Sequence, residues 1–162
     1  MAIGTTITSV TDLLAVASQI IESAERDIVW LIPAPYLVFA AQFNLKEQTK
    51  TFIQNGGRSR GITTFSSPYI KQLRERLDFG DDVRHVSDEE ELFMLVNDKR
   101  ESVSAINTGT NDISLGKRIV AYWTDDPTYA DYLLSSFEMA WEQSTDAEER
   151  IRELSEQEST EA

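Results

Sequence analysis

The sequence predicts an α/β (α+β) fold with a mixed, mainly parallel central sheet and helices on both faces. Residues 28–32 form an unbroken apolar run that ends at a proline, the pattern of a strand covered on both faces. Amphipathic segments with helical spacing alternate with short β-prone segments, which indicates parallel strands joined by helical crossovers. Residues 92–96 and 102–106 flank a polar turn and therefore predict a hairpin near the centre of the chain.

The first half of the chain predicts three helices, each with its own start or stop signal. Ser9 or Thr11 caps the first helix, which runs to about Ala24 with apolar residues at three- and four-residue spacing. The second covers residues 36–54 and ends before two glycines, which suit a left-handed C-cap. The third covers residues 69–77 and follows a Ser-Ser-Pro sequence. A strand is expected before each of these helices, at residues 5–10, 28–32 and 60–65.

The second half predicts a short strand over residues 82–86, then the hairpin, then a strand over residues 117–124. The last helix begins at Asp125-Asp126-Pro127, because acidic residues and proline favour a first turn. Its apolar face runs to about Trp141, and a weaker helical pattern continues through Ile151 and Leu154. Residues 1–154 are expected to form one domain. Residues 155–162 are acidic and almost without apolar side chains, so we expect a disordered tail.

Composition limits the classes of function. The net charge of −13 repels phosphate backbones, so direct binding of nucleic acid is not expected. The 162 residues include no cysteine and one histidine, which excludes thiolate chemistry and fits a reducing cytoplasm. No apolar run is long enough for a membrane span and no signal peptide is visible, so we expect a cytoplasmic protein away from membranes.

The element order and the central hairpin together resemble one half of the phospholipase D superfamily. In that family a strand pair carries His-x-Lys-x4-Asp, followed by Gly-Ser-x-Asn. When the aspartate is aligned with Asp98, the histidine position falls on Glu91 and the lysine position on Phe93. The sequence Ser-Ala-Ile-Asn at residues 104–107 lies near the second motif, one residue short of its spacing. Further similarities are the strand that begins at Arg60, the strand over residues 82–86 and the helix over residues 132–141.

The resemblance implies a phospholipase D half-domain without its catalysts. Family members attack phosphorus with the histidine and hold phosphate oxygens with the lysine. A glutamate at the first position repels a phosphodiester, and a phenylalanine at the second removes the stabilising cation. His85 lies on another predicted strand and cannot replace the motif histidine through a small shift in register. We therefore expect a non-catalytic sensory, ligand-binding or protein-interaction module of a regulatory kind. The alternative is a phosphodiesterase or nuclease with non-standard catalytic residues.

A neutral ligand site is expected at the carboxyl ends of the predicted parallel strands, because ligands of open α/β sheets usually bind there. The alternative for the same residues is ordinary turn and cap chemistry. His85 is considered as a ligand-contacting or pH-sensitive group, with a hydrogen-bonded strand histidine as its alternative. The candidate ligand-binding residues are Tyr36, Ser66, Ser67, Tyr69, His85, Glu91 and Asn107.

No cofactor or metal site is expected, because the acidic residues 88–91 lack the alternating spacing of a dedicated cation loop. The expected partners are a small polar ligand and either another protein or a second copy in a homodimer. The acidic tail could alternatively hold a basic protein through salt-dependent contacts.

Overall fold

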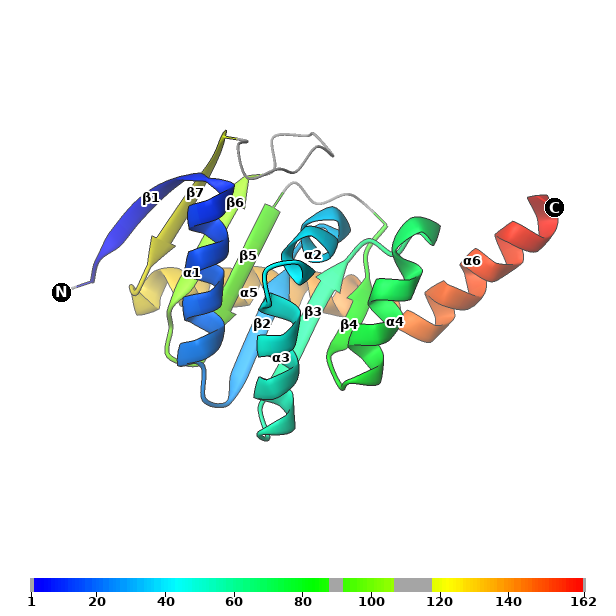
Figure 1. Ribbon diagram of the computed structural model, residues 1–162, viewed down its shortest axis with the longest axis horizontal. Coiled ribbons are helices and arrows are strands. Elements are labelled where there is room, and N and C mark those ends of the chain that lie inside the picture. Colours follow the sequence, from blue (N-terminus) through cyan, green and yellow to red (C-terminus); the bar gives the residue numbers. More distant parts are fainter. Residues whose placement is uncertain (1, 88–91, 107–117, 162) are drawn as a thin grey trace.

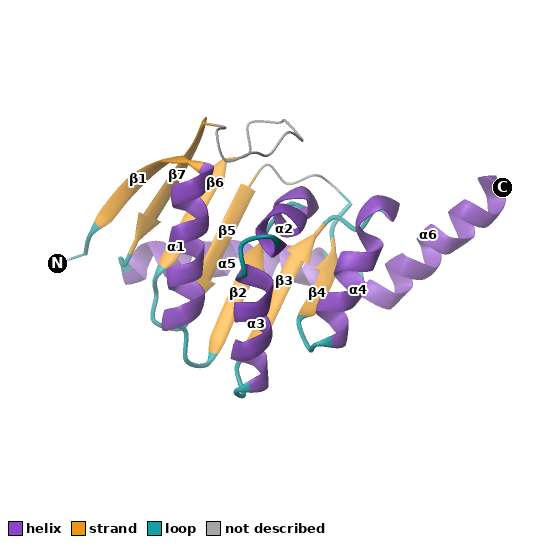
Figure 2. Cartoon of the chain, viewed as in Figure 1, coloured by secondary structure: helices purple, strands orange, loops and turns teal. Residues whose placement is uncertain are grey.

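A computed structural model describes residues 2–87, 92–106 and 118–161, and it contains a seven-stranded mixed sheet with helices on both faces (Figures 1 and 2). This architecture confirms the predicted fold class. The strands lie in the order β1-β7-β6-β5-β2-β3-β4. Their bounds are β1 Gly4–Ser9, β2 Asp27–Leu31, β3 Arg58–Thr63, β4 Asp82–His85, β5 Leu92–Asn97, β6 Ser102–Ile106 and β7 Arg118–Thr124. The helices are α1 Val10–Ser23, α2 Ala34–Ala41, α3 Leu45–Gln54, η1 Ser67–Tyr69, α4 Ile70–Asp78, α5 Pro127–Gln143 and α6 Ala147–Glu161.

The parallel part of the sheet is smaller than the sequence predicts. Among the strands that the structure describes, only β2 with β3 and β3 with β4 pair in parallel, as helical crossovers require. The β5–β6 hairpin lies between β2 and β7, and β5 pairs with β2 in the antiparallel sense. β1 and β6 both pair antiparallel with β7. The mixed sheet thus has a parallel half around β3 and an antiparallel half around β6.

Helices α1 to α4 cover one face of the sheet, and α5 lies on the other (Figure 1). β2 shows why its sequence is apolar throughout. Ile28 and Trp30 belong to the core under α1 to α4, whereas Val29 and Leu31 belong to the core under α5. Alternate residues of a strand point to opposite faces, so a doubly covered strand needs apolar residues at every position.

Two of the predicted helices are each replaced by a pair of helices. The segment 36–54 forms α2 and α3, separated at Asn44, which has a left-handed φ of 70°. The segment after Pro127 forms α5 and α6, because Thr145 leaves the helix and pairs with His85 at the free edge of β4. The break lets α6 turn against β4.

The structure extends α6 through Glu161, whereas the sequence predicts disorder beyond residue 154. Ile151 and Leu154 anchor the helix in the core, and every residue from Ser155 to Thr160 is exposed. The exposed part therefore continues a helix that its packed half begins, with glutamate and glutamine as good helix formers. Within the described ranges, every helix is too short or too polar to cross a bilayer.

Candidate functional site

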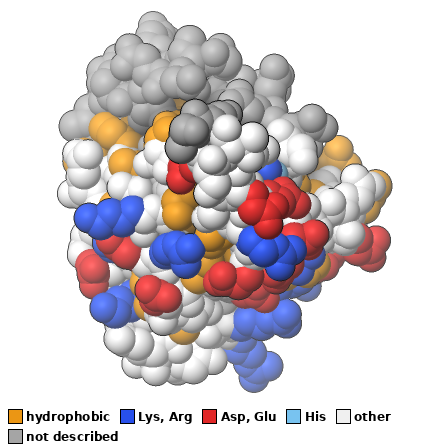
Figure 3. All heavy atoms as spheres, turned by 90° about the vertical axis from the view of Figure 1, so that its right-hand side faces the viewer, with side chains coloured by type: hydrophobic (Ala, Val, Ile, Leu, Met, Phe, Trp, Pro, Cys, Tyr) orange, Lys and Arg blue, Asp and Glu red, His pale blue; other side chains and the backbone are white. Residues whose placement is uncertain are grey.

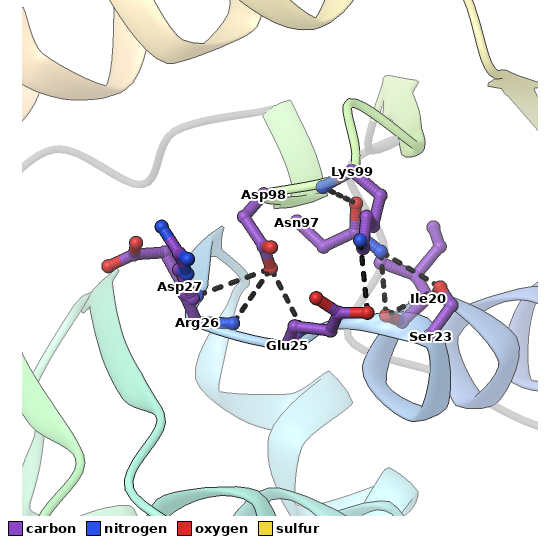
Figure 4. A network of polar contacts seen from close by, with 8 residues as sticks. All are labelled: Ile20, Ser23, Glu25, Arg26, Asp27, Asn97, Asp98 and Lys99. Atoms are coloured by element: carbon purple, nitrogen blue, oxygen red, sulfur yellow. Dashed lines mark hydrogen bonds and ion pairs between the residues drawn. The ribbon is translucent and has the colours of Figure 1, made fainter.

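The turn of the β5–β6 hairpin is fixed by Asp98, the residue aligned with the aspartate of the phospholipase D motif. One oxygen of its carboxylate accepts hydrogen bonds from the backbone N–H groups of Glu25, Arg26 and Asp27, at 3.0, 3.1 and 3.3 Å (Figure 4). Partial burial on its own raises the pKa of Asp98, but these backbone hydrogen bonds outweigh it and lower the pKa below its ordinary value. Asp98 therefore connects the hairpin to the segment between α1 and β2.

Replacing Asp98 with alanine should lower the free energy of unfolding by about 1–3 kcal/mol, because three backbone donors lose their acceptor. Urea unfolding at pH 7 measures the effect. Lys99→Ala is the matched control, since among the described residues the side chain of Lys99 makes only an exposed ion pair with Glu25, and its loss should change stability by less than about 0.5 kcal/mol. Equal effects of the two substitutions would contradict this role of Asp98.

A second polar cluster beside the turn satisfies the carboxylate of Glu101, which is 9% exposed. This carboxylate accepts hydrogen bonds from the side chains of Gln19, Ser23 and Trp123, at 2.5, 2.8 and 2.9 Å. Asn97 donates to the carbonyl oxygen of Ile20 at 2.9 Å. The sequence gives no signal for this cluster, because its members are separated by up to about a hundred residues. The hydrogen bonds of this cluster hold α1 against the hairpin.

Phe93, which is aligned with the lysine of the motif, lies inside the protein and is 6% exposed. Its ring meets the ring of Tyr36 edge-on, with centroids 5.6 Å apart and planes at 66°. Burial raises the pKa of the Tyr36 hydroxyl. Phe93 thus contributes apolar area to the core under α1 to α4, where the phospholipase D motif has a cation.

Phe93 and Tyr36 line a cavity of about 40 Å³ between the sheet and the helices α1, α2 and α3. Most of its walls are aliphatic or aromatic. The lining residues are Leu13, Leu14, Ala17, Ile21, Ile28, Trp30, Ile32, Tyr36, Leu37, Leu45, Thr49, Arg76, Phe93 and Leu95. A neighbouring cavity of about 20 Å³ lies between α2, α3 and α4 and includes Tyr69 in its lining.

These two cavities do not bring the predicted site residues together. Tyr36 and Tyr69 line different cavities, and both cavities lie within the helix layer. Ser66 and Ser67 lie at the start of η1 and line neither cavity. The reason is that Tyr36 belongs to the first turn of α2, which directs its ring to Phe93 and the core. The predicted site residues Glu91 and Asn107 lie outside the described residues.

A buried ion pair borders the larger cavity. Nη1 of Arg76 donates to Oδ2 of Asp81 at 2.8 Å, and the two side chains are 8% and 0% exposed. The guanidinium lies over the indole of Trp30 at 5.3 Å from the ring, and Nε1 of Trp30 donates to Oδ1 of Asp81 at 3.4 Å. Burial raises the pKa of Asp81, and the charge of Arg76 opposes this shift. The arrangement keeps two opposite charges compensated within the core.

His85 is a core residue of β4 with an exposure of 3%. Its Nδ1 accepts a hydrogen bond from the backbone N–H of Phe65 at 2.8 Å, and its imidazole meets the Phe65 ring edge-on. The neutral ring therefore carries its proton on Nε2. Burial, assisted by the charge of Arg150 and opposed by that of Glu153, lowers the pKa of His85 to about 4. In the described structure, the alternative of a hydrogen-bonded strand histidine accounts for this residue.

Protonation of His85 should make stability depend on pH. The unfolded imidazole has its ordinary pKa of 6.5 and takes up a proton before the folded one, whose pKa is about 4. Its contribution is fully present well above pH 6.5 and is lost as the pH falls towards 4, by about 3 kcal/mol in total. Urea unfolding between pH 7.5 and 4.5 measures this slope. His85→Asn keeps an acceptor for the N–H of Phe65 but cannot titrate, so an unchanged slope in this variant would contradict the prediction.

Within the part of the chain that the structure describes, histidine, aspartate and glutamate residues form no group of three or more that could hold a metal ion. The acidic segment 88–91 lies outside that part.

Comparison with known proteins supports the fold. No protein-family model and no curated protein sequence matches the chain. Nuc from Salmonella typhimurium, a phospholipase D family member, resembles it with a TM-score of 0.69 and 12% identity, over 90% of this chain and 98% of its own. NucT from Helicobacter pylori resembles it with a TM-score of 0.67 and 12% identity, over 90% and 99% of the two chains.

TrmBL2, described as an archaeal chromatin protein with a novel mode of DNA binding, has a TM-score of 0.69 and 16% identity over 89% of this chain. The chain spans 54% of the length of TrmBL2. At these identities the likeness establishes the fold alone. The chain has a phospholipase D-like fold.

Proposed function

We propose that this chain is a non-catalytic, ligand-binding module of regulatory function, built on a phospholipase D-like fold. The observation that carries the proposal is the position of Phe93. Where the motif of the superfamily has a lysine that holds phosphate, Phe93 packs against Tyr36 and lines an apolar cavity. An aromatic ring in this environment makes apolar contacts and cannot stabilise a developing negative charge as a lysine does.

The single histidine supports the same proposal. Phospholipase D chemistry needs an imidazole nitrogen that is free to attack phosphorus. Nδ1 of His85 accepts a hydrogen bond from the backbone N–H of Phe65. Burial lowers the pKa of His85 and so favours its neutral ring. The residue lies in β4, where its backbone pairs with Thr145 before the start of α6. Because the chain has one histidine in all, no second imidazole is available for the attack.

We expect the purified chain to leave bis-p-nitrophenyl phosphate unhydrolysed, with and without divalent metal ions. Release of p-nitrophenolate measures this, with the phospholipase D family member Nuc as the positive control. His85→Asn and Glu91→Gln distinguish intrinsic activity from contamination, because a contaminant would be unaffected by either change. If the unmodified chain hydrolyses the substrate and either variant abolishes that activity, the proposal is overturned in favour of a phosphodiesterase with non-standard catalytic residues.

The charge distribution bears on the partners that we propose. On the face formed by α4, β4 and α6, acidic and basic side chains are interspersed (Figure 3), and Arg150 pairs with Glu153 there at 3.1 Å. The net charge of −13 still favours a basic or neutral partner over nucleic acid. A small ligand, a protein partner and a homodimer remain predictions.

A further inference from the structure

The two edges of the sheet end differently. At the β4 edge, the N–H of His85 donates to the carbonyl oxygen of Thr145 at 2.9 Å, and the N–H of Thr145 donates back at 2.7 Å. Helix α6 begins beyond this bridge and contacts β4. At the other end of the molecule lies β1 (Figure 1), and no described strand pairs with its outer side. A bare edge presents backbone groups with which a further strand can pair.

The register of β1 with β7 determines which backbone groups point to the free edge. The N–H of Asp125 donates to the carbonyl oxygen of Ile3 at 3.1 Å, and the antiparallel register continues to Ile7, after which it shifts. In such a ladder every second residue exchanges hydrogen bonds with the partner strand, and the residues between them direct their N–H and C=O groups away from it. Gly4 and Thr6 are the residues between, so their backbone groups point outwards.

β1 lacks the features that usually protect an edge strand from other strands. Its sequence, Gly-Thr-Thr-Ile-Thr-Ser, contains no charged residue and no proline. The chain has 28 acidic residues and a net charge of −13, but the first acidic residue is Asp12, after the end of β1. Two copies of this strand can therefore pair without placing like charges opposite each other.

Exposed apolar side chains lie beside this edge. Ile119 and Ala121 of β7 belong to the core under α1 to α4. Val120 and Tyr122 therefore point to the opposite face, where they are 65% and 40% exposed. The ring of Tyr122 extends over β1, because a Cβ atom at Gly4 would collide with its hydroxyl group.

Tyrosines of α5 continue this surface. The ring of Tyr129 meets that of Tyr122 edge-on with centroids 5.5 Å apart, and it lies 6.4 Å from the ring of Tyr132, which is 67% exposed. Of the six large hydrophobic side chains that are exposed in the described ranges, four lie at this end of the molecule: Ile3, Val120, Tyr122 and Tyr132. Single exposed apolar residues are ordinary, whereas a cluster of them marks an interaction surface.

We propose that β1 and this apolar surface form the interface of a homodimer, in which the β1 strands of two copies pair antiparallel and join the two sheets. A two-fold axis through the β1 pair brings the same uncharged edge and the same exposed Val120 and Tyr122 from both copies, so the surface is complementary to itself. A single peptide strand would pair with the edge without supplying a matching apolar surface. This inference rests on the homodimer among the proposed partners and identifies its surface.

Analytical ultracentrifugation of the purified chain across the micromolar concentration range tests the interface. We expect a reversible monomer–dimer equilibrium with a micromolar dissociation constant. The dimer should become tighter when NaCl rises from about 0.1 M to about 1 M, because salt screens the repulsion between two acidic chains. A chain that stays monomeric would overturn the proposal. So would a dimer that salt weakens, because opposite charges would then hold it together.

Two lysine substitutions locate the interface. Val120→Lys should weaken dimerisation by at least about tenfold, because it replaces apolar contact with a charge that enters the interface from both copies. Met139→Lys is the matched control, since Met139 is also 65% exposed but lies farther along α5, and its substitution should leave the dimer unchanged. Equal effects of the two substitutions would overturn the proposed surface.

A second pair of variants tests the pairing of the strands. Thr6→Pro removes an outward N–H and should abolish the dimer while sparing the ladder to β7, because proline is tolerated at an edge position whose N–H faces solvent. Thr6→Val keeps the N–H and should keep the dimer. Circular dichroism establishes whether both variants fold. If Thr6→Pro does not fold, Val120→Lys and Met139→Lys decide the outcome. A folded Thr6→Pro chain that dimerises with unchanged affinity would overturn the strand pairing.

These outcomes are separate from that of the hydrolysis assay. A homodimer through β1 that hydrolyses bis-p-nitrophenyl phosphate would overturn the non-catalytic function and support the interface. An inactive chain that remains monomeric would overturn the interface and support the absence of catalysis.

Discussion

Replacing Gly61 with alanine is expected to lower the free energy of unfolding by about 3 kcal/mol or more, a large part of the roughly 5–15 kcal/mol that stabilises a typical domain. Gly61 on β3 lies directly opposite Trp30 on β2. A Cβ atom at this position would lie 1.8 Å from the indole of Trp30. Trp30 cannot move aside at low cost, because it is 3% exposed and is held between Arg76 and Asp81.

Ser59→Ala is the matched control for Gly61→Ala. Ser59 lies two residues earlier on the same strand, is 1% exposed, and its hydroxyl lies beside the buried carboxylate of Asp81, whose pKa it lowers. Removing that hydroxyl should cost no more than about 1.5 kcal/mol, clearly less than Gly61→Ala. Chemical unfolding and near-ultraviolet circular dichroism of tryptophan report both effects. A Gly61→Ala protein as stable as the unmodified chain would show that the indole does not cover β3 in this way.

Replacing Arg76 with methionine is expected to cost about 3–5 kcal/mol, because Asp81 would keep its charge in the core without a counter-ion. Asp81 has no exposed side-chain area and also accepts from Trp30. The loss of stability in Arg76→Met should become smaller as the pH falls. Burial already raises the pKa of Asp81, and removal of Arg76 raises it further. As the pH falls, the carboxyl of Asp81 is therefore protonated in the folded variant before it is protonated in the unfolded chain.

The double variant Arg76→Met/Asp81→Asn separates loss of charge balance from loss of packing. Asparagine keeps an acceptor for the N–H of Trp30 and removes the stranded charge, so we expect the double variant to recover at least half of the lost stability. The coupling free energy from urea unfolding at pH 7 measures the pair. If the double variant is as unstable as Arg76→Met alone, packing around the arginine dominates instead.

The sequence predicts the elements of this fold well where a local signal exists. The serine cap of α1 is present, since the Ser9 side chain accepts from the N–H of Asp12. The hairpin β5–β6 and the doubly covered strand β2 also lie where periodicity and turn residues place them. The divisions at Asn44 and Thr145 have no comparable signal, because each depends on how the chain packs after the helix begins.

The candidate site shows the same limit. Alignment on Asp98 identifies Phe93 as the residue at the lysine position, and the structure adds that its ring is buried against Tyr36. Sequence reasoning expects Tyr36, Ser66, Ser67 and Tyr69 to share one polar pocket at the strand ends. It misses the buried pair of Arg76 and Asp81, because an arginine in an amphipathic helix and an aspartate in a turn resemble any solvent-facing residues.

The sequence by itself determines that this chain has no thiol, one histidine, a strong negative charge and an alternating order of helices and strands. These properties depend on composition and on local spacing, which folding does not alter. The tertiary structure alone decides that His85 is enclosed, that Arg76 and Asp81 neutralise each other within the core, and that the space beside Phe93 is apolar. Burial and pairing decide the charge and accessibility of a side chain, and both arise from contacts between segments that are distant in the sequence.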